Sequence, residues 1–312
     1  MMTDKDTCIF ISGHTGLLGS AICRELAKQG YSNLVVRTHS ELDFVDQAAT
    51  NQFFAEAKPD YVFHCAAKIG GITATNEWQA DFLYENTMIA ANVIKAAYDC
   101  GVKQMIIPGS VCCFPKECPT PIKEEYVLTG SFEPTCEGYA MAKMTAQMMM
   151  KYFNEQYGTN FLTVNLCNLW GMNDCFDQSR NHVIPALLER IHDAKMNGDK
   201  AVTCYGTGNA KREFLYADDA AEGLVRLMQC TSVSQYTGGC INLGGVDSVS
   251  IKELAELICR IVDYDGEIVW DCSKPDGVLR RELDTTRLRT VMNWEPKVSL
   301  EEGIRKVYAS KF

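Results

Sequence analysis

Near its amino terminus the chain reads Ile11-Ser12-Gly13-His14-Thr15-Gly16-Leu17-Leu18-Gly19, between a short apolar stretch and an amphipathic stretch with helical spacing. Glycines permit a tight turn from strand to helix, and they let backbone N–H groups approach a pyrophosphate at the positive end of the helix. A G-x-x-G-x-x-G string alone also fits an ordinary turn, but this one opens a series of strands and helices. We predict that the turn binds a dinucleotide, with contacts from Gly13, Thr15, Gly16, Leu17, Leu18 and Gly19.

The alternation of strand and helix patterns continues through the first half of the chain. Strands are expected at 7–12, 33–37, 61–65, 104–108 and 161–166, and helices at 17–29, 47–57, 80–100 and 137–157. This order predicts an α/β protein with a doubly wound parallel sheet, the Rossmann arrangement.

Beyond Trp170 the pattern loosens. Helices are expected near 182–196, 218–229 and 251–263, with short strands at 202–205 and 240–243. We predict a dinucleotide-binding domain over 1–170, to which a segment around 214–246 returns. A smaller, interwoven C-terminal lobe for the substrate would comprise 171–213 and 247–312.

Composition excludes several classes of function. The 312 residues are 46% hydrophobic and 22% charged, as in ordinary globular proteins. A net charge of −10 disfavours an extended electrostatic binding surface for nucleic acid or anionic lipid. No apolar run approaches the length of a membrane span, and no signal core precedes the first strand. Fifteen cysteines without a C-x-x-C pair indicate neither a disulfide framework nor a metal site, so we expect a cytoplasmic protein.

The end of the second strand indicates which dinucleotide binds. NAD enzymes usually place a carboxylate there for the ribose hydroxyls, whereas this strand ends Val35-Val36-Arg37-Thr38-His39, with no carboxylate before Glu41. Arg37 and His39 suit a 2′-phosphate, so the sequence favours NADP(H). The alternative is that Arg37 is a solvated surface charge.

Ser110, Tyr139 and Lys143 form a candidate catalytic group. The i, i+4 spacing puts Tyr139 and Lys143 on one helix face, and Ser110 follows the fourth predicted strand. A phenol titrates near 10, so an ammonium and an oxidised nicotinamide would have to lower its pKa for proton exchange at neutral pH. In this context the three residues indicate carbonyl/alcohol redox chemistry with hydride transfer.

Several further segments carry a resemblance. They are Ala66-Ala67-Lys68-Ile69-Gly70-Gly71-Ile72, Gly109-Ser110-Val111-Cys112-Cys113-Phe114-Pro115, Glu133-Pro134-Thr135, Asn168-Leu169-Trp170-Gly171, Asn181-His182-Val183-Ile184-Pro185-Ala186-Leu187-Leu188, Arg212-Glu213-Phe214-Leu215 and Ser273-Lys274-Pro275-Asp276-Gly277. With them the chain resembles the extended short-chain dehydrogenase/reductases over nearly its whole length. Within that family it resembles the enzymes that epimerise and reduce GDP-4-keto-6-deoxymannose.

The resemblance implies an activity and its residues. The substrate ketone at C4 acidifies both C3–H and C5–H, so an acid and a base could invert both centres before NADPH reduces the ketone, giving GDP-L-fucose. Cys112 matches the family's epimerisation cysteine and His182 its histidine partner, while neighbouring Cys113 is read as structural. Tyr139 would stabilise the enolate and protonate its oxygen during reduction.

Binding residues are also implied by the resemblance. Asn168, Leu169, His182 and Lys143 would contact the cofactor, and Arg190, Tyr205, Arg212 and Asp276 would hold the GDP-sugar. The chain departs from common family patterns at Thr15 and His39, where basic residues are usual, and at Tyr205 and Trp170. Methionines at 141, 144 and 148 fit core packing, but the family pairs the corresponding helix and the one near 83–98 across a subunit interface, which implies a homodimer.

Two alternatives stay open from the sequence. One is another nucleotide-sugar enzyme of the same fold, such as a 4-epimerase or a 4,6-dehydratase; a dehydratase would carry an acidic residue where this chain has Val111 and Cys112. The other is a non-catalytic NADPH-sensing protein, which would be expected to lose the Tyr or the Lys, and both are present.

Overall fold

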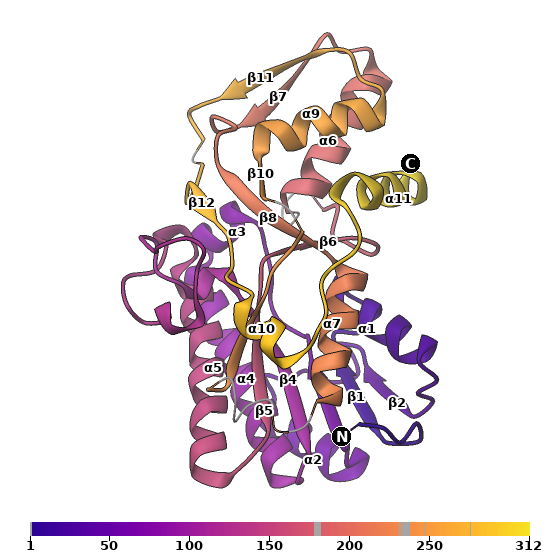
Figure 1. Ribbon diagram of the computed structural model, residues 1–312, viewed down its shortest axis with the longest axis vertical. Coiled ribbons are helices and arrows are strands. Elements are labelled where there is room, and N and C mark those ends of the chain that lie inside the picture. Colours follow the sequence, from indigo (N-terminus) through magenta and orange to yellow (C-terminus); the bar gives the residue numbers. More distant parts are fainter. Residues whose placement is uncertain (1, 178–181, 231, 233–237, 247, 275) are drawn as a thin grey trace.

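The computed structural model describes residues 2–177, 182–230, 232, 238–246, 248–274 and 276–312. Asn181 and Pro275, which belong to two of the segments quoted above, lie outside the described residues. The largest sheet is parallel throughout, in the order β2-β1-β3-β4-β5-β9 (Figure 1). Its strands are β1 (Ile9–Ser12), β2 (Leu34–Arg37), β3 (Tyr61–His64), β4 (Gln104–Ser110), β5 (Phe161–Leu166) and β9 (Cys240–Leu243).

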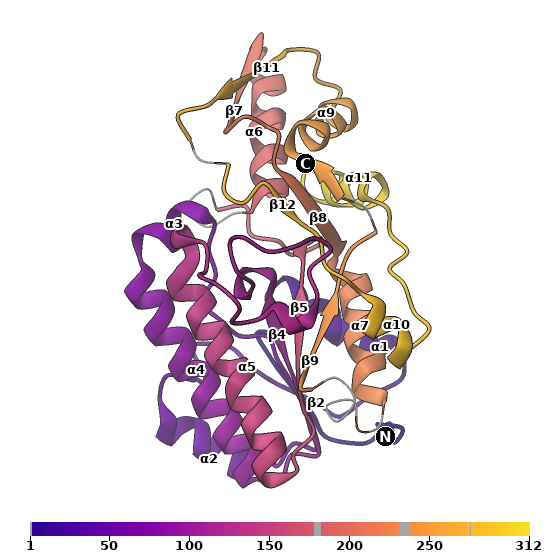
Figure 2. The same cartoon turned by 60° about the vertical axis from the view of Figure 1, so that its left-hand side comes forward.

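Helices cover both faces of this sheet, which confirms the doubly wound α/β fold (Figure 2). One face carries α1 (Leu17–Lys28) and α7 (Ala217–Gln229). The other carries α2 (Gln47–Ala57), α4 (Gln79–Asp99) and α5 (Glu137–Tyr157). The strands are buried on both sides, which explains why β1, β3 and β5 read as nearly continuous apolar runs.

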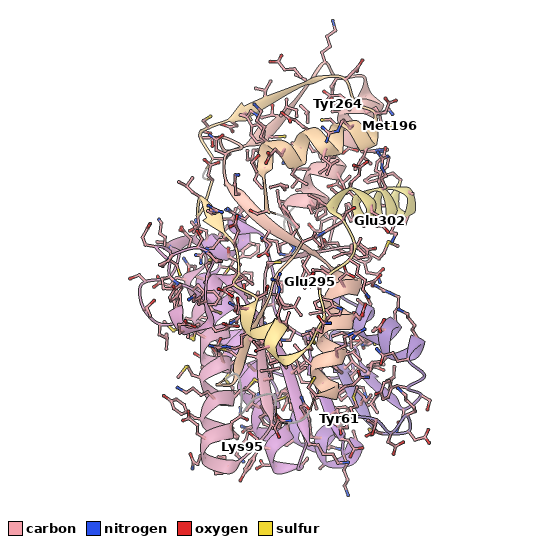
Figure 3. All side chains as sticks on the ribbon, in the orientation of Figure 1. Tyr61, Lys95, Met196, Tyr264, Glu295 and Glu302 are labelled. Carbon is pink, nitrogen blue, oxygen red and sulfur yellow. The ribbon has the colours of Figure 1, made fainter. Side chains whose placement is uncertain are left out.

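A second group of elements lies beyond the carboxyl ends of the strands, where ligands bind in open α/β sheets. Its strands are β6 (Asn168–Trp170), β7 (Ala201–Tyr205), β8 (Lys211–Tyr216), β10 (Ser248–Ser250), β11 (Glu267–Asp271) and β12 (Arg280–Arg281). Its principal helices are α6 (Val183–Asn197), α9 (Ile251–Val262) and α11 (Leu300–Lys311), which share one hydrophobic core with β7 and β8. Figure 3 shows the length of the molecule, with Tyr61 and Lys95 at one end and Met196 and Tyr264 at the other.

Short elements complete the chain around the site. They are α3 (Ile72–Glu77), α10 (Thr286–Val291) and the single 3-10 turns η1 (Val111–Cys113), η2 (Glu124–Tyr126) and η3 (Pro134–Cys136). No helix in the described part of the chain is long and apolar enough to cross a membrane. All fifteen cysteines lie in that part, and each is a free thiol.

Local sequence signals explain several helix boundaries. Asp46 caps α2, because its Oδ1 accepts the N–H of Ala49 at 3.0 Å. Ser250 and Glu253 form a reciprocal capping box at the start of α9. Gly158 ends α5 in the left-handed conformation, with φ +69°. These signals are why the predicted helices agree closely with the observed ones.

The structure also contains strands that the sequence pattern does not reveal. These strands are β6, β8, β10, β11 and β12. Three of them, β6, β10 and β12, have only two or three residues, so too few positions are available to show a period. β4 continues two residues past its predicted end at 108, because Gly109 and Ser110 still pair with β5. That extension makes Ser110 the last residue of the strand.

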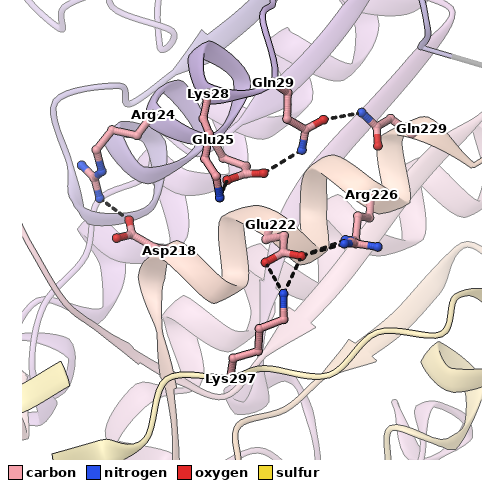
Figure 4. A network of polar contacts seen from close by, with 9 residues as sticks. All are labelled: Arg24, Glu25, Lys28, Gln29, Asp218, Glu222, Arg226, Gln229 and Lys297. Carbon is pink, nitrogen blue, oxygen red and sulfur yellow. Dashed lines mark hydrogen bonds and ion pairs between the residues drawn. The ribbon is translucent and has the colours of Figure 1, made fainter. Parts of the chain in front are cut away.

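A polar network joins α1, α7 and the segment that precedes α11 (Figure 4). Arg24 of α1 forms an ion pair with Asp218 of α7. Glu222, also in α7, accepts hydrogen bonds from Arg226 and from Lys297. The network lies on α1 and α7, which cover one face of the sheet, and it connects the segment before α11 to these two helices. It includes none of the predicted site residues.

Candidate functional site

The glycine turn has the geometry that a pyrophosphate site needs. Gly13 has φ +67°, and its carbonyl accepts the N–H of Gly16 at 3.0 Å. A Cβ on Gly19 would lie 2.2 Å from the Gly13 carbonyl oxygen, so only glycine lets α1 begin this close to the turn. The N-cap of α1 is Gly16, with no side-chain cap and no acidic residue in the first turn. The positive end of α1 is therefore left for an anion, and the turn fits a dinucleotide.

A buried hydrogen bond that was not predicted from the sequence supports the glycine turn. The Ser12 hydroxyl is 2.8 Å from His64 Nδ1, and it accepts the N–H of Ala66 at 3.0 Å. Burial lowers the pKa of His64 to about 3, so the imidazole is neutral. The pair joins the ends of β1 and β3 and fixes the backbone on which Gly13 rests.

The end of β2 presents both a cation and a carboxylate. The Arg37 side chain is exposed, and its guanidinium carbon lies 5.3 Å from the centre of the Phe53 ring. Glu41 folds back onto Thr38, whose N–H and hydroxyl each donate to its carboxylate at 2.7 Å. The Thr38 backbone hydrogen bond is the largest cause that lowers the pKa of Glu41. His39 is exposed beside this turn, as is Thr15 on the glycine loop.

Ser110, Tyr139 and Lys143 come together at the carboxyl end of β4 and the first turns of α5. The Ser110 side chain lowers the pKa of the Tyr139 phenol slightly, against the larger effect of burial. Lys143 Nζ donates to the Pro108 carbonyl at 3.0 Å and lies 5.8 Å from the centre of the Tyr139 ring. The three predicted residues therefore lie on neighbouring elements at one end of the sheet.

The pKa of the phenol differs from the sequence expectation. Burial raises the pKa of Tyr139 well above its usual range, and the nearby cysteines raise it further. Burial also lowers the pKa of Lys143. Desolvation is the largest effect on the phenol, so in the protein by itself Tyr139 is held protonated, which is the form that can donate a proton.

Cys112 and Cys113 have opposite environments within η1. Cys113 is fully buried, and burial raises its pKa to about 12. Cys112 is only partly buried, and its N–H donates to the Ser110 hydroxyl at 3.1 Å. The neighbouring Cys136 and Ser110 side chains, with the charge of Arg281, lower the pKa of the Cys112 thiol. Of the two neighbours, Cys112 is therefore the one suited to proton exchange.

Arg281 is a residue of this site that sequence reasoning missed. It lies in β12, is 6% exposed, and its Nη1 donates to the carbonyls of Val111 and Phe114 at 3.2 and 3.4 Å. It therefore fixes the turn that carries Cys112. Two adjacent arginines at 280 and 281 were the only signal in the sequence, and they did not show which one points inward.

His182 stands at the start of α6, an element that carries none of the residues above. It is the N-cap of α6, and its Nδ1 is 4.0 Å from Asp174 Oδ1, too long for a hydrogen bond. In the described part of the chain that Nδ1 is buried without a hydrogen-bond partner, as is Asp174 Oδ2. Asp174 was not predicted as a neighbour of His182.

The predicted substrate residues divide into two groups in the second lobe. Arg190 lies with its guanidinium carbon 4.3 Å from the centre of the Tyr205 ring, and Lys274 Nζ lies 5.9 Å from the same ring. Tyr205 is 56% exposed, so one aromatic face and two cations are presented to solvent. A stacked base or a phosphate fits that surface.

Arg212 and Asp276 form the other group. Arg212 Nη2 donates to the Asp276 carbonyl at 3.1 Å, and burial lowers the pKa of the guanidinium, as does neighbouring Arg281. The Asp276 carboxylate accepts the N–H and the hydroxyl of Thr207, each at 2.7 Å. Asp276 thus closes the turn after β7, while Arg212 extends toward Cys112.

Asn168 and Leu169 lie in β6, between the sheet and the second lobe. Asn168 Nδ2 donates to the Glu213 carbonyl at 3.0 Å. The Glu213 carboxylate accepts the N–H groups of Gly245 and Leu283, and burial raises its pKa to about 7. These contacts hold the crossing strands together behind the predicted nicotinamide site.

The glycine turn and the Ser–Tyr–Lys group at the carboxyl edge of one doubly wound sheet define a pyridine-nucleotide-dependent oxidoreductase of the short-chain dehydrogenase/reductase class. The chain belongs to the NAD dependent epimerase/dehydratase family, whose model matches residues 9–244.

Named relatives cover almost the whole chain. GDP-L-fucose synthase 1 from Arabidopsis thaliana is 44% identical over 98% of this chain and 94% of its own. GDP-L-fucose synthase from Escherichia coli is 42% identical over 96% of this chain and 95% of its own. Among solved structures, a GDP-mannoheptose C4 reductase from Campylobacter jejuni with NADP bound is 35% identical, with a TM-score of 0.89 over 98% of both chains.

Proposed function

We propose that this protein converts GDP-4-keto-6-deoxy-D-mannose to GDP-L-fucose by two epimerisations and one NADPH-dependent reduction. The grouping of Ser110, Cys112, Tyr139 and Lys143 at the end of β4 is the observation that carries the proposal. A plain reductase needs the Ser, Tyr and Lys, whereas the partly buried thiol with a lowered pKa supplies the proton exchange that epimerisation needs. The relatives named as GDP-L-fucose synthases support the same activity.

The residues present fit NADP(H), which supplies a hydride to C4 when bound. The uncapped start of α1 takes the pyrophosphate, and Arg37 at the end of β2 takes the 2′-phosphate. Thr15 and His39 are exposed beside this position, and Lys143, Asn168 and Leu169 border the nicotinamide end. His182, at the start of α6, is a further cofactor contact in this proposal.

Each catalytic side chain has a distinct role in the proposal. Ser110 and Tyr139 hold the C4 oxygen by hydrogen bonds, which stabilises the enolate when C3 or C5 loses its proton. Cys112 and His182 exchange protons with the two faces of the ring. Once the ring is epimerised, Tyr139 donates its proton to the C4 oxygen as the hydride arrives. Lys143 stabilises the phenolate that remains.

The GDP portion is proposed to bind across the second lobe. Arg212 faces the sugar and diphosphate, and Arg190 with Tyr205 forms the surface for the nucleotide. Asp276 contributes through the turn that it closes with Thr207.

The proposed domains are 1–170 with the returning segment 214–246, and 171–213 with 247–312. Fifteen free thiols support a cytoplasmic location.

The test of the function uses the purified protein, NADPH and the GDP-4-keto sugar in deuterated water. Deuterium at both C3 and C5 of the product, with one NADPH oxidised per sugar, is expected. Cofactor oxidation without deuterium would leave a C4 reductase, and deuterium without cofactor oxidation would leave an epimerase. If folded protein gives neither deuterium incorporation nor NADPH oxidation, the proposal is overturned.

Arg37→Ala is expected to weaken NADPH binding about 10-fold to 100-fold, because a charge-assisted hydrogen bond to the 2′-phosphate is lost. NADH binding should change little. Titration of both cofactors by fluorescence measures the two dissociation constants. Arg305→Ala, at an exposed arginine of α11 paired with Glu301, is the control. Equal losses for both cofactors would mean that Arg37 does not contact the 2′-phosphate.

We also propose a homodimer formed through α4 and α5. Their outer faces expose large apolar side chains, among them Tyr84 at 61%, Met141 at 42% and Tyr152 at 54%. Such a face is typical of an interface. Tyr152→Arg is expected to convert the dimer to a monomer in sedimentation velocity, and Met196→Arg, on α6, should not. A wild-type protein that sediments as a monomer at micromolar concentration would contradict the proposal.

A further inference from the structure

Asp174 is a buried carboxylate that has no role in the proposed reaction so far, and it lies beside His182. The Asp174 side chain is 4% exposed, and its Oδ1 is 4.0 Å from His182 Nδ1. Among the residues that the structure describes, neither Asp174 Oδ2 nor His182 Nδ1 has a hydrogen-bond partner, although both atoms are buried. Buried polar atoms are costly when they are unpaired, so two such atoms on neighbouring side chains indicate a pair.

The turn that carries Asp174 is fixed by contacts with α1 and α7. The N–H of Asp174 donates to the Gly171 carbonyl at 3.4 Å, and Gly171, with φ +152°, lies against the start of α7. Asn173 Nδ2 donates to the hydroxyl of Ser20, in α1, at 3.1 Å. Asp174 Oδ1 itself accepts the N–H of Cys175 at 2.8 Å. The position of the carboxylate is therefore set by the fold.

His182 presents one edge of its ring to Asp174 and the other edge to solvent. The His182 side chain is 42% exposed, although its Nδ1 is buried. The exposed part of the ring is therefore the edge opposite Asp174, which carries Nε2. The side chain does not cap α6, and the His182 carbonyl accepts the N–H of Ala186 at 3.0 Å. The backbone is thus held by α6, while the imidazole is directed away from the helix end.

The carboxylate beside Nδ1 decides which nitrogen carries the proton. A neutral imidazole has one N–H, and an acceptor next to one nitrogen keeps the proton on that nitrogen. In His182 this puts the proton on Nδ1 and leaves Nε2 free to accept one. The separation of 4.0 Å is about 1 Å longer than an N–H···O hydrogen bond. Catalytic hydrogen bonds are often long in a protein by itself and shorten in its complex with the reacting molecule.

We propose that Asp174 is a positioning residue for epimerisation, whose carboxylate accepts the Nδ1 proton of His182 and so directs Nε2 toward the sugar. The proton exchanged with the ring carbon moves to or from Nε2, and Asp174 keeps its negative charge throughout. That charge also stabilises the imidazolium that forms when Nε2 takes up a proton. The inference rests on the proposed function, in which His182 exchanges protons with the sugar ring.

The test locates the proton on His182 and does not need turnover. Protein that contains isotope-labelled histidine is studied by proton–nitrogen correlation NMR at about pH 8.5, where an ordinary imidazole is neutral. A ring nitrogen that carries a proton and one that does not have well-separated shifts, so the spectrum shows the tautomer. The loss of one signal in His182→Gln assigns that signal to His182. His192, whose Nδ1 is 3.0 Å from the Tyr308 hydroxyl, is the internal reference.

In the wild-type protein the proton of His182 should lie on Nδ1. Asp174→Asn keeps an oxygen for the Cys175 N–H but removes the charge, and its amide N–H can donate to Nδ1. The proton should therefore move to Nε2 in most molecules. Deuterium exchange into the sugar should fall by about 10-fold to 100-fold, the loss typical when the partner that orients a functional histidine is removed. Reduction of an already epimerised ketone should be unchanged, because that step does not use His182.

Asp193→Asn is the matched control, because it makes the same change at an exposed position of α6. It should alter neither the tautomer of His182 nor the exchange rate. A wild-type proton on Nε2 would overturn the proposal, as would a tautomer that Asp174→Asn and Asp174→Ala both leave unchanged. Thermal melting checks each variant, and Asp174→Asn alone decides if the alanine variant does not fold.

Failure of the proposed function gives a different result. If His182→Gln leaves deuterium exchange unaffected, the proposed role of His182 in proton exchange fails. The NMR signal then still decides whether Asp174 orients the imidazole.

Discussion

Tyr139→Phe should reduce the rate of C4 reduction by about 100-fold to 10,000-fold, the range expected when a positioned proton donor is removed. Burial raises the pKa of this phenol, so in the wild-type protein it holds the proton that the C4 oxygen takes up. Phenylalanine keeps the ring, including its edge contact with Phe82 at 6.2 Å between centres, so the fold should be unchanged. Stopped-flow measurement of NADPH oxidation with an already epimerised ketone isolates this step.

Cofactor binding provides the internal check on Tyr139→Phe. The dissociation constant of NADPH should change far less than the rate, because the hydroxyl contacts the reacting oxygen and not the dinucleotide. Tyr98→Phe, at the distal end of α4 where the ring stacks on Tyr157, is the matched control. Wild-type turnover by Tyr139→Phe would refute its assignment as the proton donor.

Cys112→Ser should slow deuterium exchange at C3 and C5 by about 100-fold to 10,000-fold. A serine hydroxyl stays protonated at neutral pH, so it cannot take up a proton as the deprotonated thiol can. Reduction of an already epimerised ketone should be spared, since Ser110, Tyr139 and Lys143 are untouched. NMR of the sugar protons in deuterated water measures exchange, and NADPH absorbance measures reduction.

The same thiol-to-hydroxyl change at Cys113 discriminates between the two neighbours. Cys113 is fully buried, and its Sγ donates to the Ala140 carbonyl, a bond that serine can also make. Cys113→Ser should therefore retain exchange. If Cys113→Ser loses exchange while Cys112→Ser keeps it, the roles of the two cysteines are reversed.

The second lobe shows where prediction from sequence was weakest. Two of its three principal helices were anticipated, because α6 and α9 have apolar faces with helical spacing, whereas α11 (Leu300–Lys311) was not predicted. Its strands were mostly not, because β10 and β12 have only three and two residues and take their partners from distant parts of the chain. A strand that short is defined by what it pairs with, and pairing is not visible in one sequence.

Residue roles in the site were predictable to different degrees. Ser110, Tyr139 and Lys143 could be located because the first follows a strand and the other two share a helix face. His182 and Asp276 were located only by resemblance. The structure gives them contacts with Asp174 and Thr207 that no spacing indicated, because those partners come from other segments.

The sequence by itself determined the doubly wound sheet, the dinucleotide turn and the Ser–Tyr–Lys group, because each depends on periodicity, backbone freedom or spacing within a short stretch of chain. The resemblance pointed to Cys112 rather than Cys113, but only the tertiary structure gives the physical reason why the pKa of one thiol is lowered and that of the other raised. Arg281 reaches the turn of Cys112 from a strand about 170 residues further along the chain. The pKa of a buried group depends on the charges and donors that folding gathers around it, and local sequence does not contain that information.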